Sequence, residues 1–337
     1  MNNQPGEGLV LRQVRKAFRS VVAVDDLSFT VPTGSLFGLI GANGAGKTTT
    51  LRMILSILNP DRGTITWNGT PVQEMRRSTF GYLPEERGLY LKMKTGEQLV
   101  FLAGLNNLST KEATARAHEW LGRLGLGDAW NRKVEELSKG NQQKVQVLAA
   151  ILHDPSLMLL DEPFSGLDPI NTEVLRDTLL QRRSEGRSVV FSSHRLEQVE
   201  ELCDHVAMIH KGRLLNAGPI SEIKRSTGRR LVELAFDVSG NGHVPTFTNF
   251  LSVLPQLNVR ITEQRPDSLR LELHDGARSD AILQAAMQHG PGPVTRFEIV
   301  EPSLQEIFID AVRKADPGVG EQLKEGSFIS DRVLTEG

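Results

Sequence analysis

The sequence lacks the features that mark a secreted or membrane-spanning chain. Cys203 is the only cysteine among 337 residues, so no internal disulfide can form, which fits a reducing cytosol. The longest runs of apolar or glycine residues are seven residues long, for example 99–105, whereas a membrane-spanning helix needs roughly 20 apolar residues. The N-terminal segment has neither the basic nor the apolar region of a signal peptide. We therefore expect a cytosolic chain that does not itself span a membrane.

The sequence also lacks a charge bias. It has 39 Lys and Arg residues against 41 Asp and Glu residues, which leaves a net charge of −2. This balance excludes a polybasic nucleic-acid coat and an acidic disordered tail protein. Aromatic residues make up only 5%, but the 39% hydrophobic content is that of an ordinary globular protein, and we find no internal repeat. A chain of this length usually forms more than one domain, so we expect two.

The first part of the chain alternates strand and helix signals, which predicts a largely parallel sheet covered on both faces. Asn68-Gly69 separates two short strand-like segments and predicts a tight hairpin, and therefore a small antiparallel piece. Between about 95 and 152 the apolar residues follow helical spacing, which indicates a helical insert. Strands are predicted at 10–14, 27–31, 35–40, 157–160, 188–191 and 206–209, and helices near 172–183 and 195–202.

A change of composition at 224–230 indicates a linker before a second domain. The segments after it follow the order β-α-β-β-α-β, which is typical of a ferredoxin-like α+β fold. We therefore predict domains at 1–227 and 228–313, and a flexible tail at 314–337. The strands of the second domain are predicted at 231–238, 257–264, 268–274 and 294–300, and its helices at 246–254, 279–288 and 303–313.

The clearest chemical motif follows the strand that ends at Ile40. Gly41-Ala-Asn-Gly-Ala-Gly-Lys-Thr48 matches G-x-x-x-x-G-K-[ST] in the strand-to-helix setting of a phosphate-binding loop, or P-loop. Its glycines let backbone N–H groups face a phosphate, and the next helix adds its positive dipole end. A glycine-rich turn that contains Lys by chance is the alternative, which the flanking strand and helix disfavour. The expected nucleotide ligands are Asn43, Gly44, Ala45, Gly46, Lys47 on the β- and γ-phosphates, Thr48 on Mg²⁺ and Thr49 on the α-phosphate.

A second apolar strand, 157–160, runs into Asp161 and Glu162. Asp161 stands where a P-loop site holds Mg²⁺. Glu162 could take the proton of the attacking water, which typically contributes about 10² to 10⁴ in rate. A leucine-rich strand that ends in exposed acids is common, but behind a P-loop the pattern indicates a nucleotide-hydrolysing site.

The stretch Leu137-Ser138-Lys139-Gly140-Asn141 resembles the L-S-G-G-Q signature of ATP-binding cassette (ABC) ATPases. The resemblance continues through 161–163, 165–168 and His194 in family order, and covers about 8–227. It implies a P-loop ABC ATPase domain with a parallel core sheet, a small antiparallel β subdomain and a helical subdomain. It also implies that Ser138 and Gly140 bind the γ-phosphate of ATP held by a second ATPase subunit. With one P-loop per chain, a homodimer is expected.

The same resemblance assigns three further residues. His194 matches the switch histidine, which contacts the γ-phosphate and orients Glu162, although a His after such a strand is more often structural. Asp168 resembles the aspartate of the D-loop at the dimer interface, and an ordinary turn acid is the alternative. Phe18 stands where the family has an aromatic ring that stacks on adenine, since stacking needs only a ring face; a core Phe is the alternative.

The sequence departs from the family pattern at three positions. Glu85 stands where the family has a Gln that touches Mg²⁺ and water, and a carboxylate can still coordinate Mg²⁺ although it adds negative charge. Lys139 and Asn141 replace a Gly and the Gln of the signature, and Lys139 is expected to face solvent. His118, His153, His205 and His210 lack metal-ligand spacing and are expected to be ordinary residues.

The segments 81–94 and 302–308 resemble the sodium-extrusion and drug-resistance exporter ATPases of bacteria. This implies an ATP-hydrolysing subunit that drives a separate membrane permease for export of sodium, a drug or a similar cargo, at the inner face of the cell membrane. No nucleic-acid partner is expected. The permease should dock near 85–105, with Leu89, Tyr90 and Met93 in the surface unless they pack inside the helical insert. An importer ATPase, or a soluble ATPase acting on ribosomes or DNA, are the alternatives. The second domain could bind a regulator, pair with its copy or brace the permease.

Overall fold

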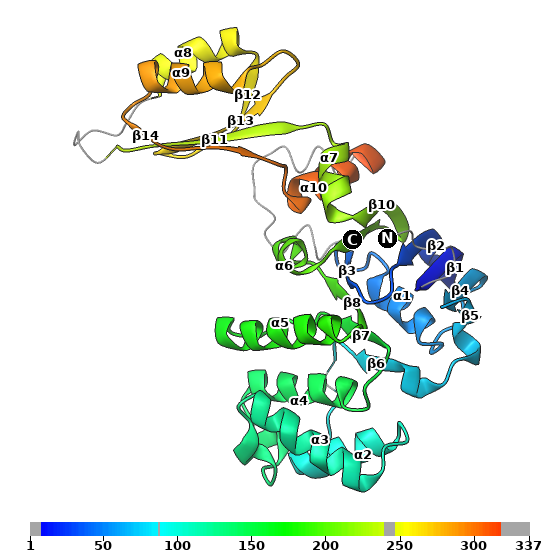
Figure 1. Ribbon diagram of the computed structural model, residues 1–337. Helices are drawn as coiled ribbons and strands as arrows, with labels where there is room; N and C mark the ends of the chain where they lie inside the picture. Colours follow the sequence, from blue (N-terminus) through cyan, green and yellow to red (C-terminus); the bar gives the residue numbers. More distant parts are fainter. Residues whose placement is uncertain (1–7, 87, 239–246, 318–337) are drawn as a thin grey trace. The chain divides into compact units, whose positions relative to one another are not determined.

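The computed structural model describes residues 8–86, 88–238 and 247–317. Within them the chain divides into two compact units (Figure 1). The first unit contains the described residues up to Ile220 together with those from Phe308 onward, and the second is Ser221–Ile307. Most of the predicted tail 314–337 lies outside the described residues, as do Arg87 and the first residue, 246, of a predicted helix.

The first unit is built on a six-stranded sheet in the order β10-β9-β3-β8-β7-β6. The five strands from β9 to β6 are parallel, and β10 pairs antiparallel with β9 at one edge. Every residue of β3, β7 and β8 is buried, as expected for parallel strands with continuous apolar runs. The parallel core sheet predicted from the sequence is confirmed. The strands are β3 (Leu36–Ile40), β6 (Phe80–Leu83), β7 (Leu157–Asp161), β8 (Ser188–Ser193), β9 (His205–His210) and β10 (Arg213–Pro219).

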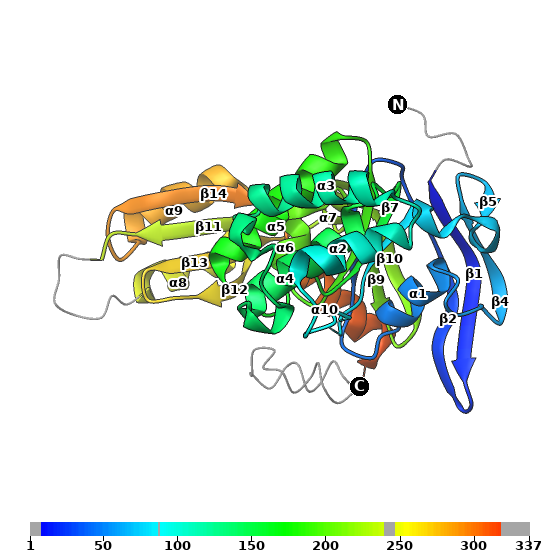
Figure 2. The same cartoon turned by 90° about the horizontal axis from the view of Figure 1, so that it is seen from below.

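A smaller antiparallel sheet, in the order β2-β1-β4-β5, forms the β subdomain of the first unit. Asn68 and Gly69 have φ angles of 48° and 80°, so the predicted tight turn is confirmed. The Phe29 and Phe37 rings stack with their centroids 5.5 Å apart and join this sheet to the parallel one. Figure 2 shows the blue antiparallel strands beside α1. The elements are β1 (Leu9–Phe18), β2 (Val21–Val31), α1 (Lys47–Ile54), β4 (Arg62–Trp67) and β5 (Thr70–Pro71).

The predicted helical insert is confirmed as three helices that gather at one end of the first unit (Figure 1). Leu99 and Leu121 are fully buried between them, and Ser109 forms a capping box with Glu112 at the start of α3. No helix in the described part of the chain has both the length and the apolar character needed to cross a membrane. The helices are α2 (Thr95–Gly104), α3 (Thr110–Arg123) and α4 (Lys139–Ile151), and α5 (Pro169–Ser184) and α6 (Leu196–Leu202) follow along the chain.

The predicted linker at 224–230 is largely wrong. Helix α7 (Ile220–Ser226) continues through most of it, and β11 begins at Arg230, so that only 227–229 connect the two elements. Strand β10 also had no prediction, because its Asn, Gly and Pro residues give a weak strand signal. It forms because the Lys211-Gly212 turn, with φ angles of 46° and 78°, folds it back onto β9.

The second unit is a four-stranded antiparallel sheet in the order β12-β13-β11-β14. Its elements follow the predicted β-α-β-β-α-β order, with α8 and α9 on one face of the sheet (Figure 1). Val232, Leu234 and Phe236 face these helices and pack with Phe250 in the core. The elements are β11 (Arg230–Phe236), α8 (Thr248–Val253), β12 (Val259–Gln264), β13 (Ser268–Leu273), α9 (Ser279–His289) and β14 (Val294–Val300), and α10 (Leu304–Ala315) follows.

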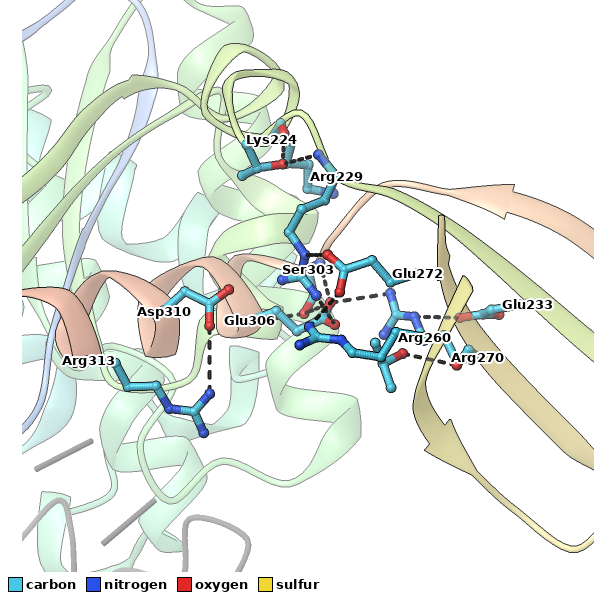
Figure 3. A network of polar contacts seen from close by, with 12 residues as sticks. Lys224, Arg229, Glu233, Arg260, Arg270, Glu272, Ser303, Glu306, Asp310 and Arg313 are labelled. Atoms are coloured by element: carbon cyan, nitrogen blue, oxygen red, sulfur yellow. Dashed lines mark hydrogen bonds and ion pairs between the residues drawn. The ribbon is translucent and has the colours of Figure 1, made fainter. Parts of the chain in front are cut away.

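The other face of this sheet carries charged side chains, because successive residues of a strand point to opposite faces. Glu272 accepts hydrogen bonds from Arg229 at 2.5 Å and Arg260 at 2.6 Å (Figure 3). Arg270 lies 3.6 Å from Glu233, its cross-strand partner, and 3.3 Å from Glu306. Three strands of the unit, β11, β12 and β13, and the start of α10 therefore share one ion-pair network.

Candidate nucleotide-binding site

The loop between β3 and α1 has the shape of a phosphate-binding loop. Gly44 and Gly46 have φ angles of 76° and 102°, so the backbone curls through a region that L side chains rarely adopt. A Cβ atom on Gly46 would lie 2.4 Å from the carbonyl oxygen of Ala23, so no larger residue fits. Gly46 is also the N-cap of α1 and offers no side-chain acceptor, which leaves the first amides of the helix for a ligand.

Lys47, the first residue of α1, is a buried cation. Its Nζ atom donates to the carbonyl oxygens of Gly41 at 2.8 Å and Ala42 at 3.2 Å, and lies 3.8 Å from Glu162 Oε1. Burial lowers the pKa of Lys47, and the nearby negative charges of Glu162, Asp161 and Glu85 oppose that shift. An ammonium held beside the loop by backbone carbonyls is suited to neutralise an incoming phosphate.

Asp161 and Glu162 lie at the carboxyl end of β7, where the sequence predicts them. Glu162 has a φ angle of 48°, and its Oε2 atom lies 3.0 Å from Nδ1 of His194, which follows β8. Burial raises the pKa of Glu162, and His194 and Lys47 oppose that rise. The Oδ2 atom of Asp161 is buried and has no hydrogen-bond partner among the described residues. A buried carboxylate oxygen in that situation is a free ligand for a cation.

These residues surround one cavity of about 250 Å³. Within it the P-loop meets Glu85, Asp161 and Glu162, which is the grouping that the sequence predicts. Among the described residues no three His, Cys, Asp or Glu side chains gather as metal ligands. Mg²⁺ in phosphate sites needs only one or two carboxylates besides phosphate oxygens, so Thr48, Asp161 and Glu85 fit that ion. The cavity is lined by Ala23, Asn43, Gly44, Ala45, Gly46, Lys47, Thr48, Thr49, Glu85, Asp161 and Glu162.

Ser138, Gly140 and Asp168 do not line this cavity and form a second cluster. Ser138 is the N-cap of α4 and Asp168 is the N-cap of α5, each accepting a backbone N–H from the residue three positions later. A Cβ atom on Gly140 would lie 2.7 Å from Nδ2 of Asn171, so the two helix starts are in contact. The N–H of Asn171 lowers the pKa of Asp168. The side chains of Ser138 and Asp168 are exposed, which leaves this cluster open to a partner.

Phe18 also lies outside the cavity. It ends β1 at the tip of the hairpin with β2, its side chain is 44% exposed, and the Lys16 ammonium lies 5.7 Å from its ring centroid. The alternative of a core Phe is therefore wrong. The stacking of adenine on this ring stays a prediction.

The predicted docking segment is partly buried. Leu89 is a core residue, which corrects the prediction that it belongs to the docking surface, whereas Met93 is half-buried. Tyr90 is 57% exposed and contacts Phe101 of α2 edge to face, with ring centroids 6.3 Å apart. Leu91 and Leu105 are exposed as well. The exposed apolar surface is therefore formed by Tyr90, Leu91, Phe101 and Leu105, which we call the α2 surface.

Three site residues had no prediction, because they reach the site through the fold. Ala23 of β2 lines the cavity. Gln146 of α4 donates to the carbonyl oxygens of Pro84 and Glu86 at 3.2 Å each, and so holds the loop that carries Glu85. Ser192 of β8 contacts both Asp161 and Glu162. A buried Gln within an apolar helix face was the one available signal, since such a group needs partners.

Of the other positions that depart from the family signature, Lys139 faces solvent as predicted and Asn141 is half-buried in the first turn of α4. Neither side chain lines the nucleotide cavity.

Comparison with known proteins gives a consistent result. Residues 24–165 match the family model "ABC transporter", and residues 218–312 match "ATP-binding protein DrrA1-3-like, C-terminal domain". The chain is 44% identical over 304 residues to the uncharacterized ABC transporter ATP-binding protein YhaQ of Bacillus subtilis, covering 90% of this chain and 98% of that protein. It is 30% identical over 319 residues to the daunorubicin/doxorubicin resistance ATP-binding protein DrrA of Streptomyces peucetius, covering 92% and 93%.

A solved ATP-binding subunit of an ABC transporter superposes on the chain with a TM-score of 0.61 at 32% identity, covering 65% of this chain and 93% of that one. The P-loop cavity and the similarity along nearly the whole length of the relatives agree. The chain therefore belongs to the ATP-binding proteins of ABC transporters, a family that binds and hydrolyses ATP.

Proposed function

We propose that this chain is the ATP-hydrolysing subunit of an exporter, and that it dimerises on ATP and drives a separate membrane permease. The observation that carries the proposal is the grouping of Lys47, Asp161 and Glu162 around one cavity, while Ser138 lies outside it. The cavity supplies the groups that bind and hydrolyse a triphosphate. The signature cluster, Ser138, Gly140 and Asp168, does not line that cavity, and its exposed Ser138 and Asp168 side chains are accessible to a second copy.

Within one copy, the P-loop residues bind the phosphates and Lys47 neutralises their β and γ charges. Thr48 and Asp161 would hold Mg²⁺, with Glu85 as a weaker ligand, and the ion would supply further charge neutralisation at the phosphates. Glu162 takes a proton from the attacking water, and His194 holds the Glu162 carboxylate in place. Phe18 provides a ring for adenine.

The signature cluster completes the site of the other copy. Ser138 and Gly140 lie at the start of α4, whose dipole favours an anion, and we propose that they bind the γ-phosphate held by the partner subunit. Asp168 lies against Gly140 and would cross the same interface. Two bound triphosphates then bridge surfaces that otherwise separate. Closure is the step that does work, and loss of the γ-phosphate reopens the pair.

The α2 surface is our proposed docking site for the permease, which would hold the subunit at the inner face of the cell membrane. Its Tyr90, Leu91, Phe101 and Leu105 side chains are between 46% and 65% exposed, and such grouped apolar side chains mark interaction surfaces. The drug-resistance ATP-binding protein among the relatives supports export of a drug or similar cargo, and sodium remains a further candidate. The ATPase core does not itself set the direction, so import is the competing outcome.

The substitution Glu162→Gln tests the proposal. The carboxamide keeps the size of the side chain but cannot accept the proton, so we expect ATP binding to persist, turnover to fall by about 10² or more, and a dimer to accumulate with ATP. Hydrolysis by steady-state assay, nucleotide affinity by titration and mass by light scattering give the three readouts. Glu119→Gln on the exposed face of α3 is the control.

Unchanged hydrolysis by Glu162→Gln would show that another group is the base. A monomer that hydrolyses ATP at full rate with a bulky residue at Ser138 would contradict the shared site. Recovery of ribosomes or DNA, rather than a membrane protein, with the purified chain would favour the soluble alternative.

A further inference from the structure

Ser192 occupies a position that no part of the proposed mechanism uses. It is fully buried in β8, directly beside β7, and the parallel register of the two strands pairs it with Asp161. Adjacent residues in register point to the same face of a sheet, so the Ser192 hydroxyl meets the end of β7 where the two carboxylates stand.

The hydroxyl of Ser192 is shared between the two acidic residues. The backbone N–H of Glu162 donates to Ser192 Oγ at 2.9 Å. Because Oγ is the acceptor there, its single proton is free to point at Asp161, whose Oδ1 atom lies 2.5 Å away. Both donor and acceptor capacity of the hydroxyl are therefore used within the site.

These two bonds have different consequences. The bond to Asp161 occupies Oδ1 and fixes the carboxylate plane, which leaves the buried Oδ2 atom as the free ligand. The bond from Glu162 fixes a peptide whose φ of 48° is unfavourable for a residue with a side chain. That turn brings the Glu162 carboxylate to within 3.0 Å of His194 and 3.8 Å of Lys47.

We propose that Ser192 is a positioning residue for ATP hydrolysis, which fixes the Asp161 carboxylate for the metal and the Glu162 backbone for proton transfer. Ser192 acts through these two residues and does not touch the nucleotide. His194 follows two positions later, directly after the end of β8, so this strand would set the geometry of all three groups. This inference rests on the proposed roles of Asp161 and Glu162.

The test uses Ser192→Ala in the full chain, which removes the hydroxyl and creates no clash. We expect kcat to fall by about 10- to 100-fold, the usual effect of removing a group that orients a metal ligand, while KM for ATP changes by less than about threefold. A second readout does not depend on turnover. Titration of a fluorescent ATP analogue should give unchanged affinity without Mg²⁺ and a smaller gain in affinity when Mg²⁺ is added.

Ser188→Ala is the matched control. Ser188 is equally buried at the other end of β8, and its hydroxyl accepts a hydrogen bond from the backbone N–H of Gly34 at 2.7 Å. Its loss should lower the melting temperature as much as the loss of Ser192 but leave kcat and the Mg²⁺ response unchanged.

The inference would be overturned if Ser192→Ala kept the wild-type kcat and Mg²⁺ response. It would also be overturned if Ser192→Ala and Ser188→Ala changed kcat and the Mg²⁺ response equally. Glu162→Gln separates this failure from that of the proposed function. If Glu162→Gln abolishes turnover and Ser192→Ala does not change it, only the positioning role is wrong. If Glu162→Gln hydrolyses ATP normally, the assignment of the base fails first.

Discussion

At the scale of single residues, the site depends on a few charged side chains that are buried, where desolvation of the charge costs free energy. Lys47 and Glu162 are both buried, and each partly compensates the burial of the other at 3.8 Å. Glycine has the complementary role, because it lets the backbone come close where a side chain would collide. Gly46 lies against Ala23 of β2, so the P-loop packs against the antiparallel sheet.

The substitution Gly46→Ala should weaken nucleotide binding by more than the accompanying loss of folding stability accounts for. The new Cβ would lie 2.4 Å from Ala23 oxygen and would force the loop to shift, in addition to a cost of about 1–2 kcal/mol for a left-handed φ. We expect ATP affinity to fall at least about tenfold, measured by titration of a fluorescent ATP analogue. Gly186→Ala is the control, because Gly186 has a φ of 80° but no neighbouring atom within 4 Å of a Cβ. Equal affinity in the two variants would refute the steric argument.

At the scale of elements, α4 and α2 connect the nucleotide site to the two surfaces that we propose for other chains. Helix α4 is capped at its N-terminus by the exposed Ser138 and, about two turns later, holds the loop around Glu85 through Gln146. That loop lines the nucleotide cavity and leads to the α2 surface. Under the proposed function, a movement of this loop would link the nucleotide state to the docked permease.

Tyr90→Ser combined with Phe101→Ser should weaken capture of the membrane partner. The two rings contact each other and are 57% and 46% exposed, so their removal deletes the aromatic centre of the α2 surface with little effect on the core. We expect co-purification of the permease from membranes to fall about tenfold, while the isolated subunit keeps its ATP affinity. Ile57→Ser, at a single apolar side chain that is 58% exposed, is the control. Cross-links that form only through other regions would contradict the docking site.

At the scale of the whole molecule, the second unit has its own hydrophobic core and its own ion-pair network. Glu272 lies at the centre of that network, with a side chain that is only 11% exposed. Burial raises the pKa of Glu272, but the hydrogen bonds from Arg229 and Arg260 outweigh burial and lower it below the ordinary value of 4.5. The ionised form is therefore favoured in the folded unit.

A carboxyl group with a lowered pKa stabilises the folded state above its unfolded pKa, and this contribution is lost as the pH falls through the folded pKa. Glu272→Gln should accordingly destabilise the second unit at neutral pH by roughly 1–3 kcal/mol, and the difference from the unmutated chain should shrink below about pH 4.5. Thermal melts of the full chain between about pH 3 and pH 7 provide the measurement, because this range extends well to either side of the ordinary carboxyl pKa of Glu. Glu263→Gln, which removes an exposed pair with Arg265, should have little effect at any pH. A difference that does not vary with pH would argue against the charge of Glu272.

Local sequence chemistry determined much of this protein. The P-loop, the Asn68-Gly69 turn, the Asp161-Glu162 strand end and the β-α-β-β-α-β order were all predictable, because backbone preference and apolar spacing act over a few residues. The tertiary structure decided what strand register and helix packing bring together. It placed Ser192 beside Asp161 and Gln146 against the Glu85 loop, and it buried Leu89 while leaving Phe18 exposed. Such contacts join residues that are distant in the chain, so no local pattern encodes them.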